Sequence, residues 1–190
     1  MRDCIIEALK NIKKLVNLYL TTIGFMLLLY MINLLNPSTL GKIDSIKIFN
    51  LELYSAYFSL AYGILFGVFI VVLSLQIGVL KRTIIQIKSH ENDDYNSLIE
   101  SIKYYPWIVS PFHESKIGFL IFRSAIVVSF IFLGIFACSH MFGNIPQDAK
   151  VIYEYKYRLI GYVDALIFIG GTVLATWIYK NICFIKRELC

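Results

Sequence analysis

Two ionisable side chains within long apolar stretches are the residues best placed for chemistry in this sequence. Asp164 lies early in the last apolar stretch, and His140 lies near the end of the stretch before it. An ionisable group inside a membrane costs roughly 3 kcal/mol or more, so it needs a partner. If the two stretches run antiparallel, His140 and Asp164 lie at similar depth and are expected to form a polar intramembrane pair. Two uses stay open: the pair holds two helices together, or it is a functional polar site that lines a pore or senses a stimulus.

Arg123 is the remaining charged residue inside an apolar stretch, about two turns from its start. A long arginine side chain reaches the membrane surface from that depth, so we expect a snorkelling cation, with a contact between helices as the alternative. Arg123 and Asp164 are predicted to lie near opposite faces of the membrane and are not expected to pair.

Two His-Glu dipeptides, His90-Glu91 and His113-Glu114, are the nearest approach to a metal site. The H-E-x-x-H spacing is absent, and a solvated polar loop is the better interpretation of both. The sequence also contains no G-x-S-x-G motif, no phosphate-binding glycine loop and no paired carboxylates in the apolar stretches. We therefore expect no catalytic residues, no metal and no cofactor, and a protein that is not an enzyme.

The elements that must position these side chains are membrane helices. The chain has 190 residues, of which 58% are hydrophobic and 16% charged, and its mean hydropathy is +0.68. Soluble domains do not combine these values. A helix needs roughly 20 apolar residues to cross about 30 Å of hydrocarbon, and four stretches approach this length. The sequence therefore predicts one all-α membrane domain over residues 1–190, with four transmembrane helices at about 15–35, 54–80, 117–142 and 159–179.

The distribution of Lys and Arg sets the expected orientation. Twelve of them lie before the first stretch, between the second and third, and after the fourth, whereas five lie in the other two connections. Cytoplasmic loops carry the excess of positive charge, so both termini and the connection 81–116 are predicted to be cytoplasmic. The net charge of +5 suits anionic lipid headgroups, and direct nucleic-acid binding is not expected.

Both outer connections alternate apolar or aromatic residues with charged ones. Residues 46–48 and 51–53 show this period of two, as does the segment with Tyr153, Tyr155 and Tyr157. Period two is typical of strands, so the sequence suggests a small β-hairpin outside the membrane, with 153–157 as an outer strand. Interfacial tyrosine anchors at the helix ends are an equal alternative.

The cytoplasmic connection 81–116 is the only sizeable polar segment. Start signals at 92–94 and an apolar stripe predict a short amphipathic helix that ends near Pro106. This surface either lies on the membrane or docks a soluble partner, and the sequence does not separate the two. The expected docking residues are Asp93, Leu98, Ile99, Ile102, Tyr105 and Trp107.

Small residues at a spacing of four predict close helix packing, within one chain or between copies. These pairs are Gly63 with Gly67, Gly161 with Ala165, and Gly171 with Ala175. Gly170-Gly171 is also the only hint of an interrupted helix. A self-assembled pore would need polar lumen positions, for which Asn17, Thr21, Thr22 and Asn33 are the candidates.

The whole chain resembles the KwaA family, the membrane subunits of the bacterial Kiwa anti-phage system. The resemblance rests on length, four spans with cytoplasmic ends, a single cytoplasmic loop, a Tyr-rich outer connection and Met1-Arg2-Asp3-Cys4 before a lysine-flanked first span. It implies a homo-oligomer in the inner membrane that detects phage at the envelope. It also implies a soluble, DNA-binding partner protein, KwaB. It assigns no role to individual residues.

The expected function is therefore an oligomeric sensor and anchor in the inner membrane that recruits a cytosolic effector. Its partners would be the lipid bilayer, further copies of the chain and that effector. Two alternatives remain: a self-assembling pore or ion-conducting effector, and a membrane protein of the bacteriocin-immunity type.

Overall fold

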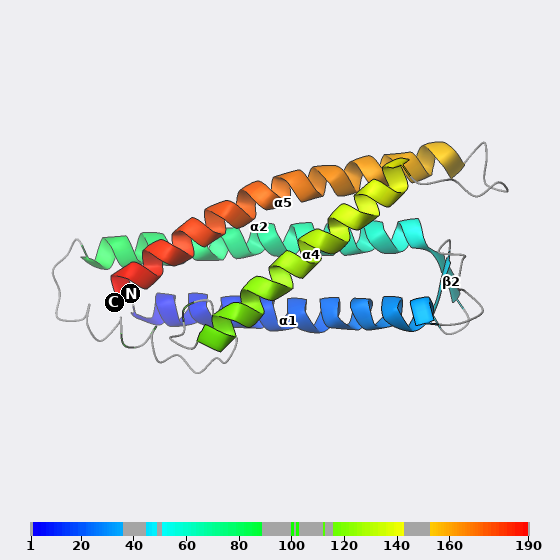
Figure 1. Ribbon diagram of the computed structural model, residues 1–190. Coiled ribbons are helices and arrows are strands. Elements are labelled where there is room, and N and C mark those ends of the chain that lie inside the picture. The colour runs from blue at the N-terminus through cyan, green and yellow to red at the C-terminus, as the bar shows by residue number, and fades with distance from the viewer. Residues whose placement is uncertain are drawn as a thin grey trace. The chain divides into compact units, whose positions relative to one another are not determined.

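The computed structural model describes residues 2–35, 45–48, 51–88, 100, 102, 112, 116–142 and 153–189 (Figure 1). The described part of the chain forms four long helices and one small sheet. In chain order the elements are α1 (Arg2–Leu35), β1 (Ser45–Ile48), β2 (Leu51–Tyr54), α2 (Ser55–Lys88), α4 (Lys116–Phe142) and α5 (Tyr153–Leu189).

Three of these helices are long and apolar enough to cross a membrane. The segments that qualify among the described residues are Tyr57–Lys88, Ile117–Phe142 and Arg158–Glu188. At 1.5 Å per residue, even the shortest extends about 39 Å, more than the roughly 30 Å of hydrocarbon in a bilayer. This supports the prediction of a membrane protein. Helix α1 covers the whole first predicted stretch, 15–35, and its crossing of the membrane stays a prediction.

Two of the helices extend past the predicted spans. Helix α2 runs eight residues beyond the expected end at Leu80, and α5 continues to Leu189 instead of ending at Tyr179. Leu80, Ile84 and Ile87 are all buried, and their spacing of four and three residues places them on one helix face. The extension therefore continues the buried stripe of the span.

The chain divides into two compact units, each built from segments of all four helices. Unit 1 comprises Met1–Leu18, Phe69–Val127 and Thr172–Cys190, and unit 2 comprises Tyr19–Val68 and Val128–Gly171. The core of unit 1 is mostly aliphatic, with the additional buried rings of Phe69, Phe112 and Phe122. Its aliphatic members include Ile5, Leu9, Ile12, Leu80, Ile84, Ile182 and Ile185.

Aromatic rings dominate the core of unit 2. The ring of Phe66 meets that of Phe130 edge-on at 4.8 Å between centroids, and Phe136 contacts the rings of Phe58 and Tyr62. Edge-to-face packing of this kind is favoured by the ring quadrupoles. The interior of unit 2 is therefore apolar apart from the few polar groups described below.

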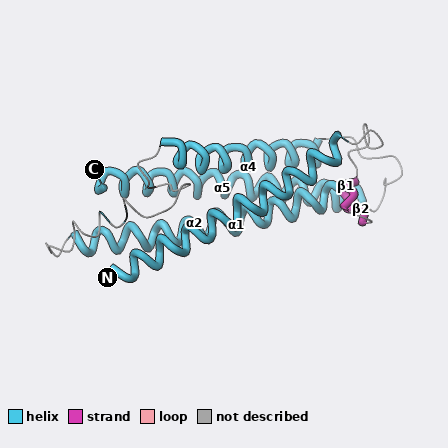
Figure 2. The backbone as a smooth tube through the Cα atoms, turned by 90° about the horizontal axis from the view of Figure 1, so that it is seen from below, coloured by secondary structure: helices cyan, strands magenta, loops and turns pink. Residues whose placement is uncertain are grey.

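The connection between α1 and α2 contains the two strands. β1 pairs with β2 in antiparallel register, with Ile46 opposite Leu53 and Lys47 opposite Glu52, and Figure 2 shows the strands beside each other. The predicted outer strand at 153–157 is wrong, because α5 begins at Tyr153. The alternating pattern directly precedes a long apolar helix, and extending an existing helix by a turn costs far less than nucleating a strand pair.

Candidate functional site

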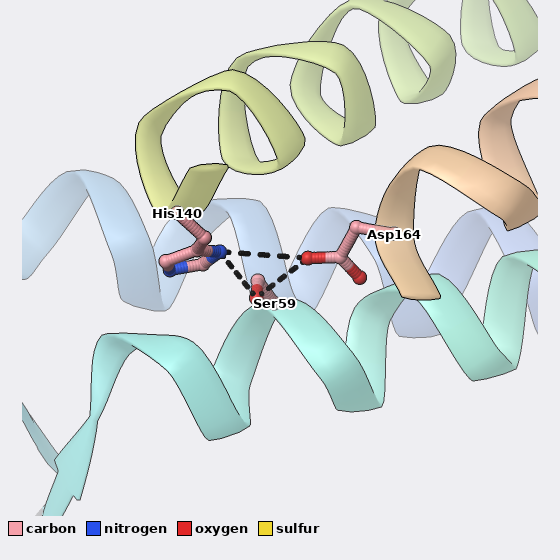
Figure 3. A network of polar contacts seen from close by, with 3 residues as sticks. All are labelled: Ser59, His140 and Asp164. Atoms are coloured by element: carbon pink, nitrogen blue, oxygen red, sulfur yellow. Dashed lines mark hydrogen bonds and ion pairs between the residues drawn. The ribbon is translucent and has the colours of Figure 1, made fainter. Parts of the chain in front are cut away.

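Ser59, His140 and Asp164 form a buried polar cluster in unit 2. They come from α2, α4 and α5, respectively, and their polar atoms point toward one another (Figure 3). Ser59 Oγ donates a hydrogen bond to Asp164 Oδ2 at 3.0 Å and lies 3.3 Å from His140 Nδ1. His140 Nδ1 lies 3.5 Å from the same carboxylate oxygen. The side chains of His140 and Asp164 are 2% and 0% exposed, so the cluster is closed to solvent.

The direction of the Ser59 hydrogen bond fixes the role of the imidazole. A hydroxyl has one proton, and Ser59 donates it to Asp164, so Ser59 Oγ accepts from His140. This assigns a proton to Nδ1 of His140, where it also faces the carboxylate.

The three residue types are those of a hydrolytic triad, but their arrangement differs. In a triad the histidine lies between the other two residues, with the acid on one ring nitrogen and the serine on the other. Here Ser59 and Asp164 face the same nitrogen, and the hydroxyl proton is directed to the acid. The histidine is not placed to activate the serine, so the geometry suits a contact between three helices better than nucleophilic catalysis.

Two glycines allow the helices to approach at this cluster. A Cβ on Gly63 would lie 2.9 Å from Asp164 Oδ1, and a Cβ on Gly161 would lie 3.0 Å from both His140 Cβ and the backbone nitrogen of Met141. Contacts below 3.0 Å do not occur for real Cβ atoms, and backbone atoms cannot move aside cheaply. Gly63 therefore makes room for the carboxylate, and Gly161 brings α5 against the end of α4.

One oxygen of the cluster is left unpaired. Asp164 Oδ1 is buried and has no hydrogen-bond partner among the residues that the structure describes. A carboxylate oxygen without a partner costs free energy in an apolar site. Asp164 therefore has a hydrogen bond on Oδ2 and none on Oδ1. Small changes in packing around this carboxylate should change the stability of the protein.

Two further polar contacts belong to unit 2. The Tyr19 hydroxyl hydrogen-bonds Ser129 Oγ and so connects α1 with α4. Arg158 Nη1 donates to the carbonyl oxygen of Met141, near the end of α4, where a helix has unpaired carbonyls and a cation is favoured. The first contact joins helices that are far apart in the sequence, and the second joins two consecutive helices.

Unit 1 contains the extensions of α2 and α5. Lys81 Nζ donates to Asn181 Oδ1 at 2.9 Å, and Lys88 Nζ forms an ion pair with Glu188 Oε2 at 2.5 Å. Ile84, Ile182 and Ile185 between these contacts are buried. The two helices therefore stay packed together beyond the apolar stretches and form a projection, defined here as residues 81–88 with 180–188.

The remaining residues singled out from the sequence are placed as follows. Arg123 is exposed on α4. Gly67 is in ordinary contact with Ile167, and Gly171 packs closely against Phe130, whereas nothing lies near Gly170. Helix α5 runs without interruption through Gly170 and Gly171, so the hint of a broken helix is wrong. Ala165 and Ala175 are half-buried on α5.

The predicted docking residues lie mostly outside the described residues. Ile102 is the exception, and it is helical and buried. An isoleucine that is buried in this chain does not present a free surface to a partner. The predictions for Asp93, Leu98, Ile99, Tyr105 and Trp107 fall outside the part of the chain that the structure describes, as do those for the two His-Glu dipeptides.

Ser59 is the member of the cluster that sequence reasoning missed. Its spacing of four from Gly63 was the available signal, because both residues then lie on the face of α2 that approaches α5. A lone serine in an apolar helix is common, since its hydroxyl is often bonded to its own backbone. Only the tertiary contact distinguishes Ser59 from such a serine.

Comparisons of this chain with protein-family models, with curated proteins and with solved structures find no match. The functional argument therefore depends on the geometry of the chain itself.

Proposed function

We propose that this protein is a sensor and anchor in a bacterial inner membrane that recruits a soluble effector on the cytoplasmic side. The observation that carries the proposal is the projection of α2 and α5, which has a buried isoleucine core and a polar contact at each end. A helix that served only to cross the bilayer would not need this packed extension. The projection offers a rigid, charged surface to a partner outside the membrane.

The distribution of charge supports the proposed topology of four spans with cytoplasmic ends. Unit 1 holds 13 of the 18 Lys and Arg residues and 8 of the 13 Asp and Glu residues, whereas unit 2 holds five of each. The whole net charge of +5 therefore belongs to unit 1. By the positive-inside rule, unit 1 is the cytoplasmic end. The β1–β2 sheet belongs to unit 2 and lies on the outer side in this proposal.

The buried cluster supports the sensing part of the proposal. Ser59, His140 and Asp164 join three helices through polar contacts of 3.0–3.5 Å. Polar contacts inside an apolar bundle are directional, so a shift of one helix breaks them as a group. A stimulus that moves one helix in unit 2 would thus have to break these polar contacts together, and breaking them costs free energy.

The resemblance to the KwaA family gives the proposal a biological setting. In that setting the stimulus is phage at the envelope, the protein acts as a homo-oligomer, and the soluble effector is KwaB. The projection and the positive cytoplasmic end are compatible with such a partner.

A pull-down in mild detergent from the native host tests the recruitment of an effector. We would compare wild type with Arg82→Glu, which reverses an exposed charge on the projection, and with Leu75→Ala, an exposed position on the apolar part of the same helix. Intact-mass analysis should find a stoichiometric soluble protein with wild type and Leu75→Ala but not with Arg82→Glu. A homo-oligomer without any soluble protein in all three samples would contradict the proposal.

A self-assembled pore is the second candidate, favoured by the exposure of Asn17 and Thr21. These polar residues lie one turn apart on α1, whereas the exposed faces of α2 and α4 carry Leu, Val and Ile. Several copies could turn this polar stripe toward a common lumen. Ion flux into liposomes that contain only this protein would support the pore, and Asn17→Leu should then reduce the flux.

A further inference from the structure

An aromatic ring on the projection holds two cations. Lys81 Nζ lies 4.9 Å and Arg187 Cζ 5.8 Å from the centroid of the Phe184 ring. Both distances are within the roughly 6 Å of a cation–π contact. Two positive charges on neighbouring helices are thus gathered around one side chain of unit 1.

The positive charges of this site are not neutralised by an acid. Lys81 has the uncharged Asn181 as its hydrogen-bond partner, and the Asn181 amide nitrogen donates to the carbonyl of Trp177, which directs its oxygen to Lys81. Among the residues that the structure describes, neither Lys81 nor Arg187 has a carboxylate within ion-pair distance, whereas Lys88 on the same helix is paired with Glu188. Two like charges held together without an acid favour an anion.

The site lies where the apolar parts of α2 and α5 end. Leu80 is the last residue of the apolar stretch of α2, and Lys81 follows it directly. Trp177 packs against Gly78 one turn before the site, and Trp177 and Tyr179 are both exposed. Tryptophan and tyrosine are enriched at the level of lipid headgroups. A phosphate group of the lipid headgroups is the anion that a bilayer would offer to cations beside such an aromatic belt.

We infer that Lys81, Phe184 and Arg187 form a binding site for the phosphate of an anionic phospholipid. Lys81 keeps two N–H donors beyond its bond to Asn181, and the Arg187 guanidinium supplies a planar set of donors suited to phosphate. The inference is independent of any soluble effector, since it uses only the headgroup layer.

The two cations set the expected selectivity. A zwitterionic headgroup carries its own positive charge, so it gains little from a site with two cations, whereas phosphatidylglycerol has no such charge. Each basic residue near an anionic lipid surface adds to the affinity for the lipid. The loss of two such residues should lower this affinity by about thirtyfold.

Native mass spectrometry of the intact protein in a neutral detergent tests the site. The protein is titrated in parallel with dioctanoyl phosphatidylglycerol, dioctanoyl phosphatidylcholine and inorganic phosphate. The variants are Arg187→Gln, which changes an exposed residue, and the double substitution of Lys81→Gln with Arg187→Gln. Lys88→Gln is the matched control because it removes the same charge from the same helix, and Lys81→Arg is the conservative variant.

We expect wild type, Lys88→Gln and Lys81→Arg to bind phosphatidylglycerol at least tenfold more tightly than phosphatidylcholine. Arg187→Gln should lose about fivefold and the double variant about thirtyfold in affinity for phosphatidylglycerol. Equal binding by the double variant and wild type would overturn the inference. So would an equal loss in Lys88→Gln, which would indicate general attraction, or tighter binding of inorganic phosphate than of the lipid, which would indicate a site for a free anion.

Discussion

At the scale of single residues, the cluster of Ser59, His140 and Asp164 constrains the packing around it, because all three polar side chains are buried. Its three side chains meet from three helices, and the only hydroxyl proton available is already directed to the acid. Asp164 Oδ1 has no hydrogen-bond partner among the described residues, so the carboxylate makes its contacts to Ser59 and His140 through Oδ2. Substitutions of His140 and Asp164 should therefore depend strongly on each other.

A double-mutant cycle measures this dependence. His140→Gln and Asp164→Asn should each destabilise the protein, because each leaves the other group buried without its partner. The double variant should cost about 1–3 kcal/mol less than the two single costs together. Thermal unfolding in detergent, followed by tryptophan fluorescence, gives the three values. Strictly additive costs would show that the two side chains do not interact.

Gly161 and Gly170 offer a second test at the residue scale. Gly161→Ala should destabilise the protein by about 1–3 kcal/mol, since the added Cβ would meet the backbone of α4 at 3.0 Å. Gly170→Ala is the matched control on the same helix. Nothing lies within 4 Å of its position, so it should be neutral or stabilise by up to about 1 kcal/mol. The same unfolding assay compares them, and equal effects would refute the close contact at Gly161.

The sequence predicted part of this site. His140 and Asp164 stand out because ionisable residues are rare in apolar stretches and must find partners. Gly63 and Gly161 were visible from their spacing. Ser59 was not, because a hydroxyl in a membrane helix is usually satisfied by its own backbone and leaves no pattern. Lys81 and Arg187 likewise looked like two of many flanking cations until the fold placed both at Phe184.

At the scale of elements, the helices were predicted well in position and poorly in length. Hydropathy marks only the part of a helix that lies in hydrocarbon, so residues 54–80 and 159–179 were found but their polar continuations were not. The segment 153–157 shows the opposite error, because a period of two was taken for a strand. In a helix, Glu154 and Arg158 have the i, i+4 spacing that favours opposite charges, and this signal was overlooked.

The projection should owe its stability to its buried isoleucines more than to its ion pair. Ile185→Ala removes a fully buried side chain and should cost about 2–4 kcal/mol, with earlier hydrogen exchange in 180–188. Lys88→Gln breaks a contact whose lysine side chain is 58% exposed, and an exposed pair contributes at most about 1 kcal/mol. Hydrogen exchange with mass spectrometry compares the protection of residues 180–188 in the Ile185→Ala and Lys88→Gln variants. A larger loss of protection in Lys88→Gln would contradict this account of the projection.

At the scale of the whole molecule, the proposed topology can be tested through an exposed cysteine. Cys183 is a free, exposed thiol on the projection, which we propose to be cytoplasmic. In a variant with the other three cysteines replaced by serine, a membrane-impermeant maleimide should label Cys183 only after the inner membrane is permeabilised. Labelling in intact spheroplasts would place the projection outside and reverse the proposed orientation.

The continuity of α5 has a mechanical consequence. The helix runs for 37 residues without a break, which is about 55 Å at 1.5 Å per residue. A continuous hydrogen-bonded helix resists sharp local bending along this length, and Gly170 and Gly171 do not interrupt it.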